Sequence, residues 1–208
     1  MAKFLIDPGP SRKGWHRLAK VLRCPRLYAL SYKKKHRTSD EPPAEPLVKG
    51  SLFHVGLAHH YGLQSDLYPD VELYSPGEAF EQLAQSQPQG HRAAWQRYVA
   101  EMNITLLDYQ THWHAENWIV KGIEHELMVN VYDEQVNDTY FYTQRVDLVW
   151  EHPVTGKVWF VDHKTTGRFT DKTLGGYSMN GQFLGYQMIG QKMFGEQWGG
   201  VILNIIEW

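Results

Sequence analysis

The sequence predicts an α/β fold with a mixed central sheet, helices on its flanks and a helical region at the N-terminus. Three observations support this prediction. Apolar residues recur with helical spacing through residues 89–116, a Pro- and Gly-bearing turn joins two extended segments between 141 and 164, and a continuous apolar run fills residues 200–206. The 208 residues include 42% hydrophobic ones, enough for one core, so we expect a single domain over 1–208.

Composition limits the possible classes of function. A net charge of −2 excludes a uniformly basic nucleic-acid coat, so binding to DNA would need a local positive field. The single cysteine, Cys24, excludes an internal disulfide. No signal pattern opens the chain and no segment is long and apolar enough to cross a bilayer. We therefore expect a soluble, cytoplasmic protein without membrane contact, and phage-encoded and nucleoid-associated proteins both fit this expectation.

The N-terminal part reads as helical. Two helices are expected over residues 13–32, with a short break at Pro25, which cannot continue a helix. The basic run Lys33–Arg37 follows, and it is either a solvated helix end or a phosphate contact. A further helix is expected over residues 48–63.

The sequence pattern predicts a helical insertion in the middle of the chain and a sheet in the part that follows. Two helices, over 76–85 and 89–116, form a helical block of about 67–116 that serves either as scaffold or as one wall of a DNA channel. Residues of about 117–206 form the sheet core, which begins with a strand over 118–132.

The hairpin at 141–164 gathers the charged residues of greatest interest. Its first arm carries Asp147, and its second carries Asp162 and Lys164, which point to one side because alternate strand residues share a face. Folding the arms together brings Asp147 opposite Val161 or Asp162, within a residue or two of register. Two carboxylates so close repel each other unless a cation lies between them, and oxygen ligands suit Mg²⁺ or Mn²⁺ better than zinc.

This pattern resembles the PD-(D/E)XK nuclease superfamily, and within it the RecB-like exonuclease branch, which includes CRISPR-associated and AddAB/RecB nuclease domains. The motifs of that branch occur here in the same order, as Gly50/His54, Asp147, Asp162/Lys164 and Gln182/Tyr186. The first and last pairs each lie one turn apart on an expected helix, the last one over 178–194. The resemblance implies a restriction-endonuclease-like core.

The resemblance also implies roles for individual residues. The implied catalytic residues are Lys164, Asp162, Asp147 and Glu124. The implied ligands of Mg²⁺ or Mn²⁺ are His54, Asp147, Asp162 and the main-chain carbonyl of His163. The implied nucleic-acid contacts are Gln182, Tyr186 and Arg145.

Several of these roles have alternatives. Glu126 competes with Glu124 for the acidic position in the strand before the hairpin. Arg145 shares a face with Asp147, and it holds that carboxylate, contacts phosphate or forms a simple ion pair. Lys164 positions or deprotonates the attacking water, or stabilises the charge of the transition state.

The implied activity is that of a metal-dependent DNA exonuclease, which hydrolyses phosphodiester bonds in DNA repair, recombination or CRISPR-type processing. The alternative is a catalytically weak DNA-binding module of a larger helicase–nuclease assembly. The expected partners are DNA that is single-stranded or has free ends, and a helicase or recombination protein.

An iron–sulfur cluster is not expected. Residues Cys24–Tyr28 match a Cys-Pro-x-x-aromatic signature in which the cysteine is often a cluster ligand in the RecB-like branch. The other three cysteines of that cluster are absent, so this is either a cluster-free relative or a chain that naturally continues past Trp208.

Overall fold

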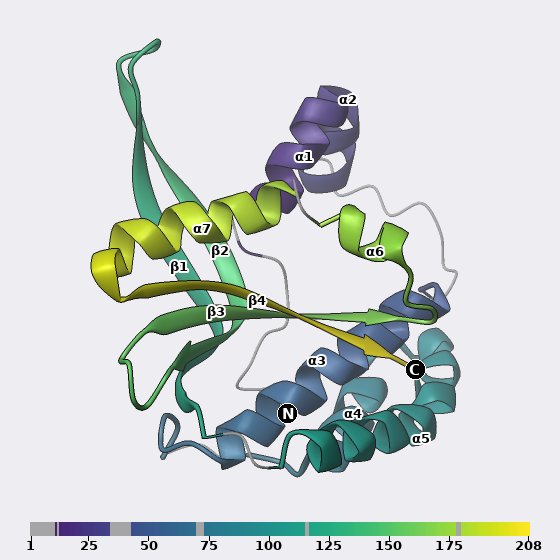
Figure 1. The fold of residues 1–208 in the computed structure, drawn as a ribbon. Helices are drawn as coiled ribbons and strands as arrows, with labels where there is room; N and C mark the ends of the chain where they lie inside the picture. The colour runs from purple at the N-terminus through teal and green to yellow at the C-terminus, as the bar shows by residue number, and fades with distance from the viewer. Residues whose placement is uncertain (1–10, 12, 34–42, 70–72, 115–116, 178–179) are drawn as a thin grey trace.

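A mixed four-stranded sheet organises the fold of the computed structural model, which describes residues 11, 13–33, 43–69, 73–114, 117–177 and 180–208 (Figure 1). The strand order is β1-β2-β3-β4, with antiparallel pairs β1–β2 and β2–β3 and a parallel pair β3–β4. The predicted α/β class with a mixed sheet is therefore confirmed. The strands are β1 Ile119–Asp133, β2 Asp138–Glu151, β3 Val158–Thr166 and β4 Trp198–Glu207.

The predicted helices occur in the predicted order, and a short helix that was not predicted, Asp171–Gly175, lies between β3 and the last helix. The helices are α1 Trp15–Arg23, α2 Pro25–Tyr28, α3 Glu45–Leu63, α4 Pro76–Ser86, α5 Gln89–His112, α6 Asp171–Gly175 and α7 Gly181–Phe194, with the π-helical turn η1 Ala29–Lys33 and the 3₁₀ turn η2 Gly195–Gln197. The predicted break at Pro25 separates α1 from α2. Residues 34–37 of the basic run lie outside the described part. No helix in the described ranges is long and apolar enough to span a membrane.

Several helix boundaries differ from the prediction. Helix α3 begins at Glu45, three residues before the expected start at 48. Helix α5 stops at His112, whereas the expected helix ran to residue 116; residues 115–116 lie outside the described part. Helix α7 begins at Gly181 because the side chain of Asn180 accepts a hydrogen bond from the Gln182 amide and caps the helix. The expected start at 178 falls on residues outside the described part.

Each face of the sheet has its own helices and its own hydrophobic core. Helices α3, α4 and α5 cover one face and α7 covers the other (Figure 1). Leu148 and Val161 pack under α3, whereas Val146 and Phe160 pack under α7. The site described below lies between these two layers.

The sheet divides in the middle of the hairpin. Strands β2 and β3 pair only from Glu151–Val158 to Leu148–Val161. Beyond this point β2 continues beside β1, and β3 continues beside β4. Asp147 and Asp162 are the next residues along the two arms, so the two aspartates lie where the strands part, in agreement with the predicted register.

The side-chain alternation of β2 also reverses here. Val146 packs under α7 and Leu148 packs under α3, although residues two apart in a regular strand share a face. Asp147 lies between them, and its carboxylate reaches α3. The irregular backbone thus turns a carboxylate out of the sheet towards a helix.

Candidate metal centre and active site

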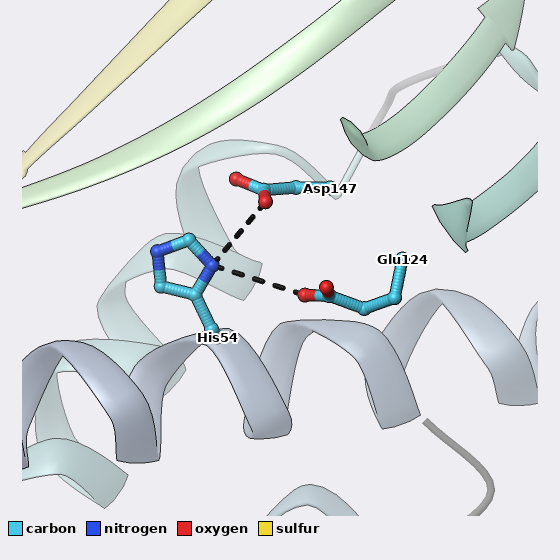
Figure 2. Close-up of side chains that lie close together, drawn as sticks. All are labelled: His54, Glu124 and Asp147. Carbon is cyan, nitrogen blue, oxygen red and sulfur yellow. Dashed lines mark ion pairs between the residues drawn. The ribbon is translucent and has the colours of Figure 1, made fainter. Parts of the chain in front are cut away.

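Three side chains from three elements converge on one point. His54 of α3, Glu124 of β1 and Asp147 of β2 each offer a ligand atom, and these atoms lie within 4.8 Å of one another (Figure 2). Nδ1 of His54 is 3.5 Å from Oδ1 of Asp147 and 3.9 Å from Oε1 of Glu124. Among the described residues this is the group of three or more histidine, cysteine or acidic side chains that could hold a metal ion.

Glu124 reaches this point through an unusual backbone. Its φ is +46°, a left-handed conformation that costs an L-residue about 1–2 kcal/mol. The strand register places Glu124 opposite Asp147, and the irregularity lets both carboxylates approach α3. Strain of this kind persists where the surrounding structure enforces it, commonly at functional sites.

His54 and the two carboxylates control one another's charge. Burial opposes protonation of His54, but Asp147 and Glu124 outweigh it and raise the pKa of His54 to about 10. Burial likewise opposes ionisation of Asp147, yet His54 holds the pKa of that carboxyl below its usual value. For Glu124 burial prevails, and the pKa rises to about 7. The protonated imidazole of His54 therefore compensates part of the negative charge of the neighbouring carboxylates.

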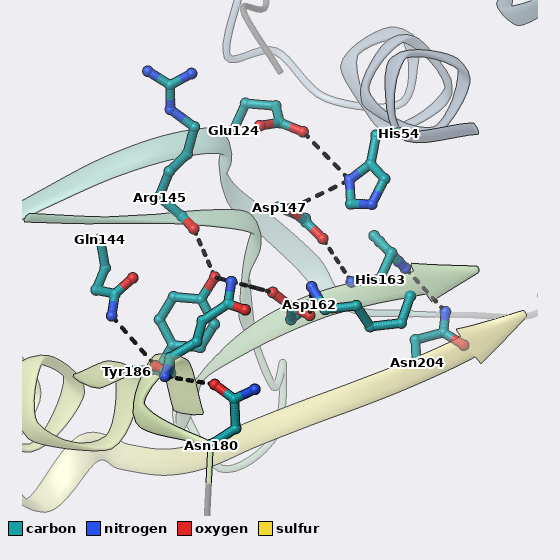
Figure 3. A network of polar contacts seen from close by, with 12 residues as sticks. His54, Glu124, Gln144, Arg145, Asp147, Asp162, His163, Asn180, Tyr186 and Asn204 are labelled. Atoms are coloured by element: carbon teal, nitrogen blue, oxygen red, sulfur yellow. Dashed lines mark hydrogen bonds and ion pairs between the residues drawn. The ribbon is translucent and has the colours of Figure 1, made fainter. Parts of the chain in front are cut away.

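Asp162 lies on the α7 side of the same site and is held by hydrogen bonds (Figure 3). Its Oδ1 lies 3.0 Å from the Tyr186 hydroxyl and accepts a 3.1 Å bond from Nε2 of Gln182. The Tyr186 hydroxyl is also 2.7 Å from the Arg145 carbonyl oxygen. The ammonium of Lys164 forms an ion pair with Oδ2 of Asp162.

Burial determines the direction of the pKa shift at Asp162, whereas at Asp147 it is outweighed by neighbouring positive charge. Burial raises the pKa of Asp162, and the nearby negative charge of Asp147 raises it further, against the opposing effect of Lys164. Burial also opposes the charge on Lys164, but Asp162 and Asp147 outweigh it and raise the pKa of the amine. Lys164 thus remains protonated beside its carboxylate.

His163 contributes through its main chain and its ring. Its amide donates a 2.6 Å hydrogen bond to Oδ2 of Asp147, which fixes that carboxylate. The buried ring stacks on Tyr61 and lies 3.2 Å from the Asn204 amide nitrogen. Burial lowers the pKa of His163 to about 3, so the ring is neutral and its Nδ1 accepts from Asn204. Metal ligation by the His163 carbonyl remains a prediction.

The predicted site residues surround one cavity of about 340 Å³. Gly50, His54, Glu124, Arg145, Asp147, Asp162, Lys164 and Gln182 all line it. Tyr186 has no exposed surface, and its contacts support a positioning role for the hydroxyl. Arg145 forms a 3.6 Å ion pair with Glu126, so the two acidic alternatives in β1 have different partners: Glu124 faces His54 and Glu126 faces Arg145.

Sequence reasoning missed several residues around the cavity. Ser11, Trp15 and His16 line it from the N-terminal segment, and no motif pointed to them. Asn204 supports His163, and here the sequence did hold a signal. It is the one polar residue in the apolar run over 200–206, and a buried amide needs a hydrogen-bond partner.

The donor set fits a divalent cation. One imidazole nitrogen and two carboxylates converge, and two of these groups are anionic when ionised, so a cation would remove their mutual repulsion. Oxygen donors suit Mg²⁺ and Mn²⁺, and imidazole is accepted more readily by first-row transition ions. His54, Glu124 and Asp147 are therefore the residues that would hold the ion.

Comparison with known families supports this assignment. A model of the PD-(D/E)XK nuclease superfamily matches residues 15–206, which is most of the chain. A search of curated proteins gives no match. Members of the superfamily are nucleases that use divalent metals, and the matched region contains every cavity residue named above except Ser11. On this evidence the chain belongs to the PD-(D/E)XK nuclease superfamily.

Proposed function

We propose that the protein is a metal-dependent DNA exonuclease of the RecB-like branch, acting in DNA repair, recombination or CRISPR-type processing. The main support is the convergence of His54, Glu124 and Asp147 beside the ion-paired Asp162 and Lys164. That arrangement places cation ligands and a protonated amine around one cavity. The order of the Gly50/His54 and Gln182/Tyr186 pairs supports the branch.

In the proposed mechanism His54, Glu124 and Asp147 would hold a Mg²⁺ or Mn²⁺ ion, which would polarise the phosphate and lower the pKa of a coordinated water. Asp162 is the further carboxylate at the edge of the site. Gln182 and Tyr186 hold Asp162 in place through Oδ1. Arg145 and Gln182 face the cavity and are the proposed contacts to the nucleic acid.

Lys164 has a separate role in this proposal. Its ammonium is kept protonated by Asp162, and a protonated amine stabilises the negative charge that develops on the phosphate. Another N–H of the same ammonium positions the attacking water through a hydrogen bond. A preorganised charge of this kind contributes most in a site with little water.

End-labelled DNA tests the proposal. Single strands labelled at the 5′ or 3′ end are incubated with Mg²⁺, Mn²⁺ or EDTA, and a circular single strand is treated in parallel. We expect mononucleotides or short products from linear DNA with either metal, none in EDTA, and an intact circle. Cleavage of the circle would instead indicate an endonuclease, and binding without cleavage would indicate the catalytically weak module.

A further inference from the structure

Positive charge is concentrated in one short part of the sequence. Residues 8–39 contain ten of the 21 Lys and Arg and none of the 23 Asp and Glu. The rest of the chain therefore holds eleven basic and 23 acidic side chains. Helices α1 and α2 belong to the basic segment and lie beside the β1–β2 ribbon and α7 (Figure 1). A nearly neutral protein thus presents one strongly basic unit.

A second cavity lies between this basic unit and β2. Its volume is about 600 Å³, within the range of roughly 300–1,000 Å³ that is typical of ligand pockets. Its lining combines cations with aromatic and aliphatic side chains: Lys13, Arg17, Leu18, Val21, Tyr28, Tyr140, Phe141 and Tyr142. We call it the basic aromatic groove.

Several aromatic rings in and beside this groove are accessible and lie next to cations. Tyr140 and Phe141 are 47% and 46% exposed. The Lys13 ammonium lies 5.4 Å from the Phe141 ring centroid, and the Arg17 guanidinium lies 4.6 Å from that of Tyr32. Aromatic faces stack on bases of any identity, and Lys and Arg bind phosphates. A single strand offers both groups together, whereas a duplex hides its base faces.

The basic aromatic groove adjoins the metal centre along two shared segments. In α1, Trp15 and His16 line the site cavity, and Arg17 lines the groove. In β2, Tyr142 lines the groove and Gln144 lines the site cavity. The two cavities therefore lie next to each other along both segments.

Close packing fixes the basic unit in this position. A Cβ on Gly181 would lie 2.5 Å from the Trp15 ring, so the start of α7 touches α1 directly. The Lys13 amide also donates a 2.7 Å hydrogen bond to the Thr143 hydroxyl, on the part of β2 beyond its pairing with β3. The helical wall of the groove is thus anchored to α7 through Trp15, and the segment before α1 is anchored to β2, the strand that forms the other wall.

We propose that the basic aromatic groove binds the single-stranded part of the substrate, with bases stacked on Tyr140 and Phe141 and phosphates on Lys13 and Arg17. This inference rests on the proposed nuclease function and specifies its substrate as unpaired nucleic acid. The groove leads the strand to the metal centre, so it favours substrates with an unpaired stretch next to the bond that is cut.

Binding without cleavage tests the groove. The affinity of the full chain for fluorescein-labelled oligothymidylate is measured by anisotropy in EDTA, with oligouridylate and a DNA duplex alongside. We expect Tyr140→Ala and Phe141→Ala, made singly, each to weaken single-strand binding roughly 5- to 150-fold, as expected for one lost base stack, and the double variant to weaken it further. Lys13→Gln with Arg17→Gln is expected to reduce the salt slope by about 1.4, for two lost phosphate contacts.

Matched variants provide the controls. Tyr132→Ala removes another exposed aromatic side chain of the same ribbon, and Lys121→Gln with Lys157→Gln removes the same charge elsewhere. Circular dichroism verifies folding. Wild-type affinity in the groove variants, equal losses in the controls, or tighter binding of the duplex would overturn the proposal. Losses for oligothymidylate alone select DNA, and equal losses with oligouridylate support the shared single-strand chemistry.

The experiments distinguish failure of the groove proposal from failure of the nuclease proposal. Single-strand binding that depends on the groove, in a protein that never hydrolyses DNA with Mg²⁺ or Mn²⁺, keeps the groove and removes the nuclease proposal. Hydrolysis that continues unchanged in the groove variants keeps the nuclease proposal and removes the groove.

Discussion

Asp147 and Asp162 lie at the same fork of the sheet but in opposite surroundings. Asp147 faces an imidazole and a second carboxylate, and His54 lowers its pKa. Asp162 is 1% exposed, is hydrogen-bonded to α7 and paired with Lys164, and has a raised pKa. One aspartate shares a group of possible metal ligands with the His54 imidazole and the Glu124 carboxylate, and the other is paired with the Lys164 ammonium.

The difference shows how one hairpin can supply two kinds of carboxylate. Asp147 is suited to bind a cation because Glu124 places a second carboxylate beside it and His54 an imidazole nitrogen. Asp162 is prepared for precise placement because hydrogen bonds from α7 fix its Oδ1. The predictions below separate these two properties, from the largest expected effect to the smallest.

Asp147→Asn should remove both metal binding and hydrolysis, because it deletes one ligand and the charge that attracts the ion. We expect a rate loss on the order of 10²–10⁴-fold, comparable with removal of a key electrostatic group. Isothermal titration with Mn²⁺ and end-labelled DNA measure the two effects. Asp138→Asn, at the start of β2, provides the control. Wild-type turnover in Asp147→Asn would contradict the assignment.

Lys164→Met should separate chemistry from metal binding. We expect a rate loss of roughly 10²–10³-fold, because the developing charge on the phosphate loses its partner. Mn²⁺ affinity should change much less than in Asp147→Asn, since an ammonium is not a ligand. Lys157→Gln, in the hairpin turn, should behave as wild type. If Lys164→Met lost as much Mn²⁺ affinity as Asp147→Asn, the surroundings of Asp147 and Asp162 would not be separable.

The pH dependence of Mn²⁺ affinity examines the Asp147 side alone. His54 has a pKa of about 10, raised by Asp147 and Glu124 against burial, and its ring must lose a proton to bind a metal. Between pH 8 and 9, where Glu124 with its pKa of about 7 is mostly ionised, each bound ion should release about one proton, so affinity should rise about tenfold per pH unit. Titrations in two buffers with different ionisation enthalpies measure the release, and His54→Gln should abolish it.

Tyr186→Phe examines the Asp162 side alone. The hydroxyl holds Asp162 from the protein interior, so its loss should reduce kcat roughly tenfold, as removal of a group that orients a ligand does. KM should change little, because Tyr186 is buried away from the nucleic acid. A large change in KM with unchanged kcat would indicate direct contact with the substrate instead.

Glu124→Gly has the smallest expected effect, and it is the one change that should stabilise the protein. Glycine relieves the left-handed φ of +46°, and the change also removes a buried acid, so the free energy of unfolding should rise by about 1 kcal/mol while activity falls. Glu126→Gly should instead destabilise the protein, since it weakens a strand and breaks the ion pair with Arg145. Thermal unfolding compares the two variants, and a lower Tm for Glu124→Gly would contradict the strain argument.

The order of elements was predictable because it depends on local signals. The turn before β3 fixes the register of the hairpin, and strand periodicity places Asp162 and Lys164 on one side. The one-turn spacing of Gln182 and Tyr186 predicts a shared face. It does not reveal whether that face points to solvent or inward, and Tyr186 proves to be buried.

Strand periodicity could not decide between Glu124 and Glu126. Residues two apart in a regular strand share a face, so both would point alike. Only the left-handed backbone at Glu124, which nothing in the residue type indicates, distinguishes them. The approach of Trp15 to the cavity was equally hidden, because it depends on packing between segments more than a hundred residues apart.

The turn that joins β2 to β3 has a consequence for engineering. The turn after Glu151 includes Val154, whose side chain is 87% exposed, so the chain can be opened there without disturbing either core. The first piece would keep His54, Glu124 and Asp147, and the second would keep Asp162, Lys164 and Gln182. Neither half alone would hold all of these proposed catalytic residues, so recovered cleavage would report reassembly of a split enzyme.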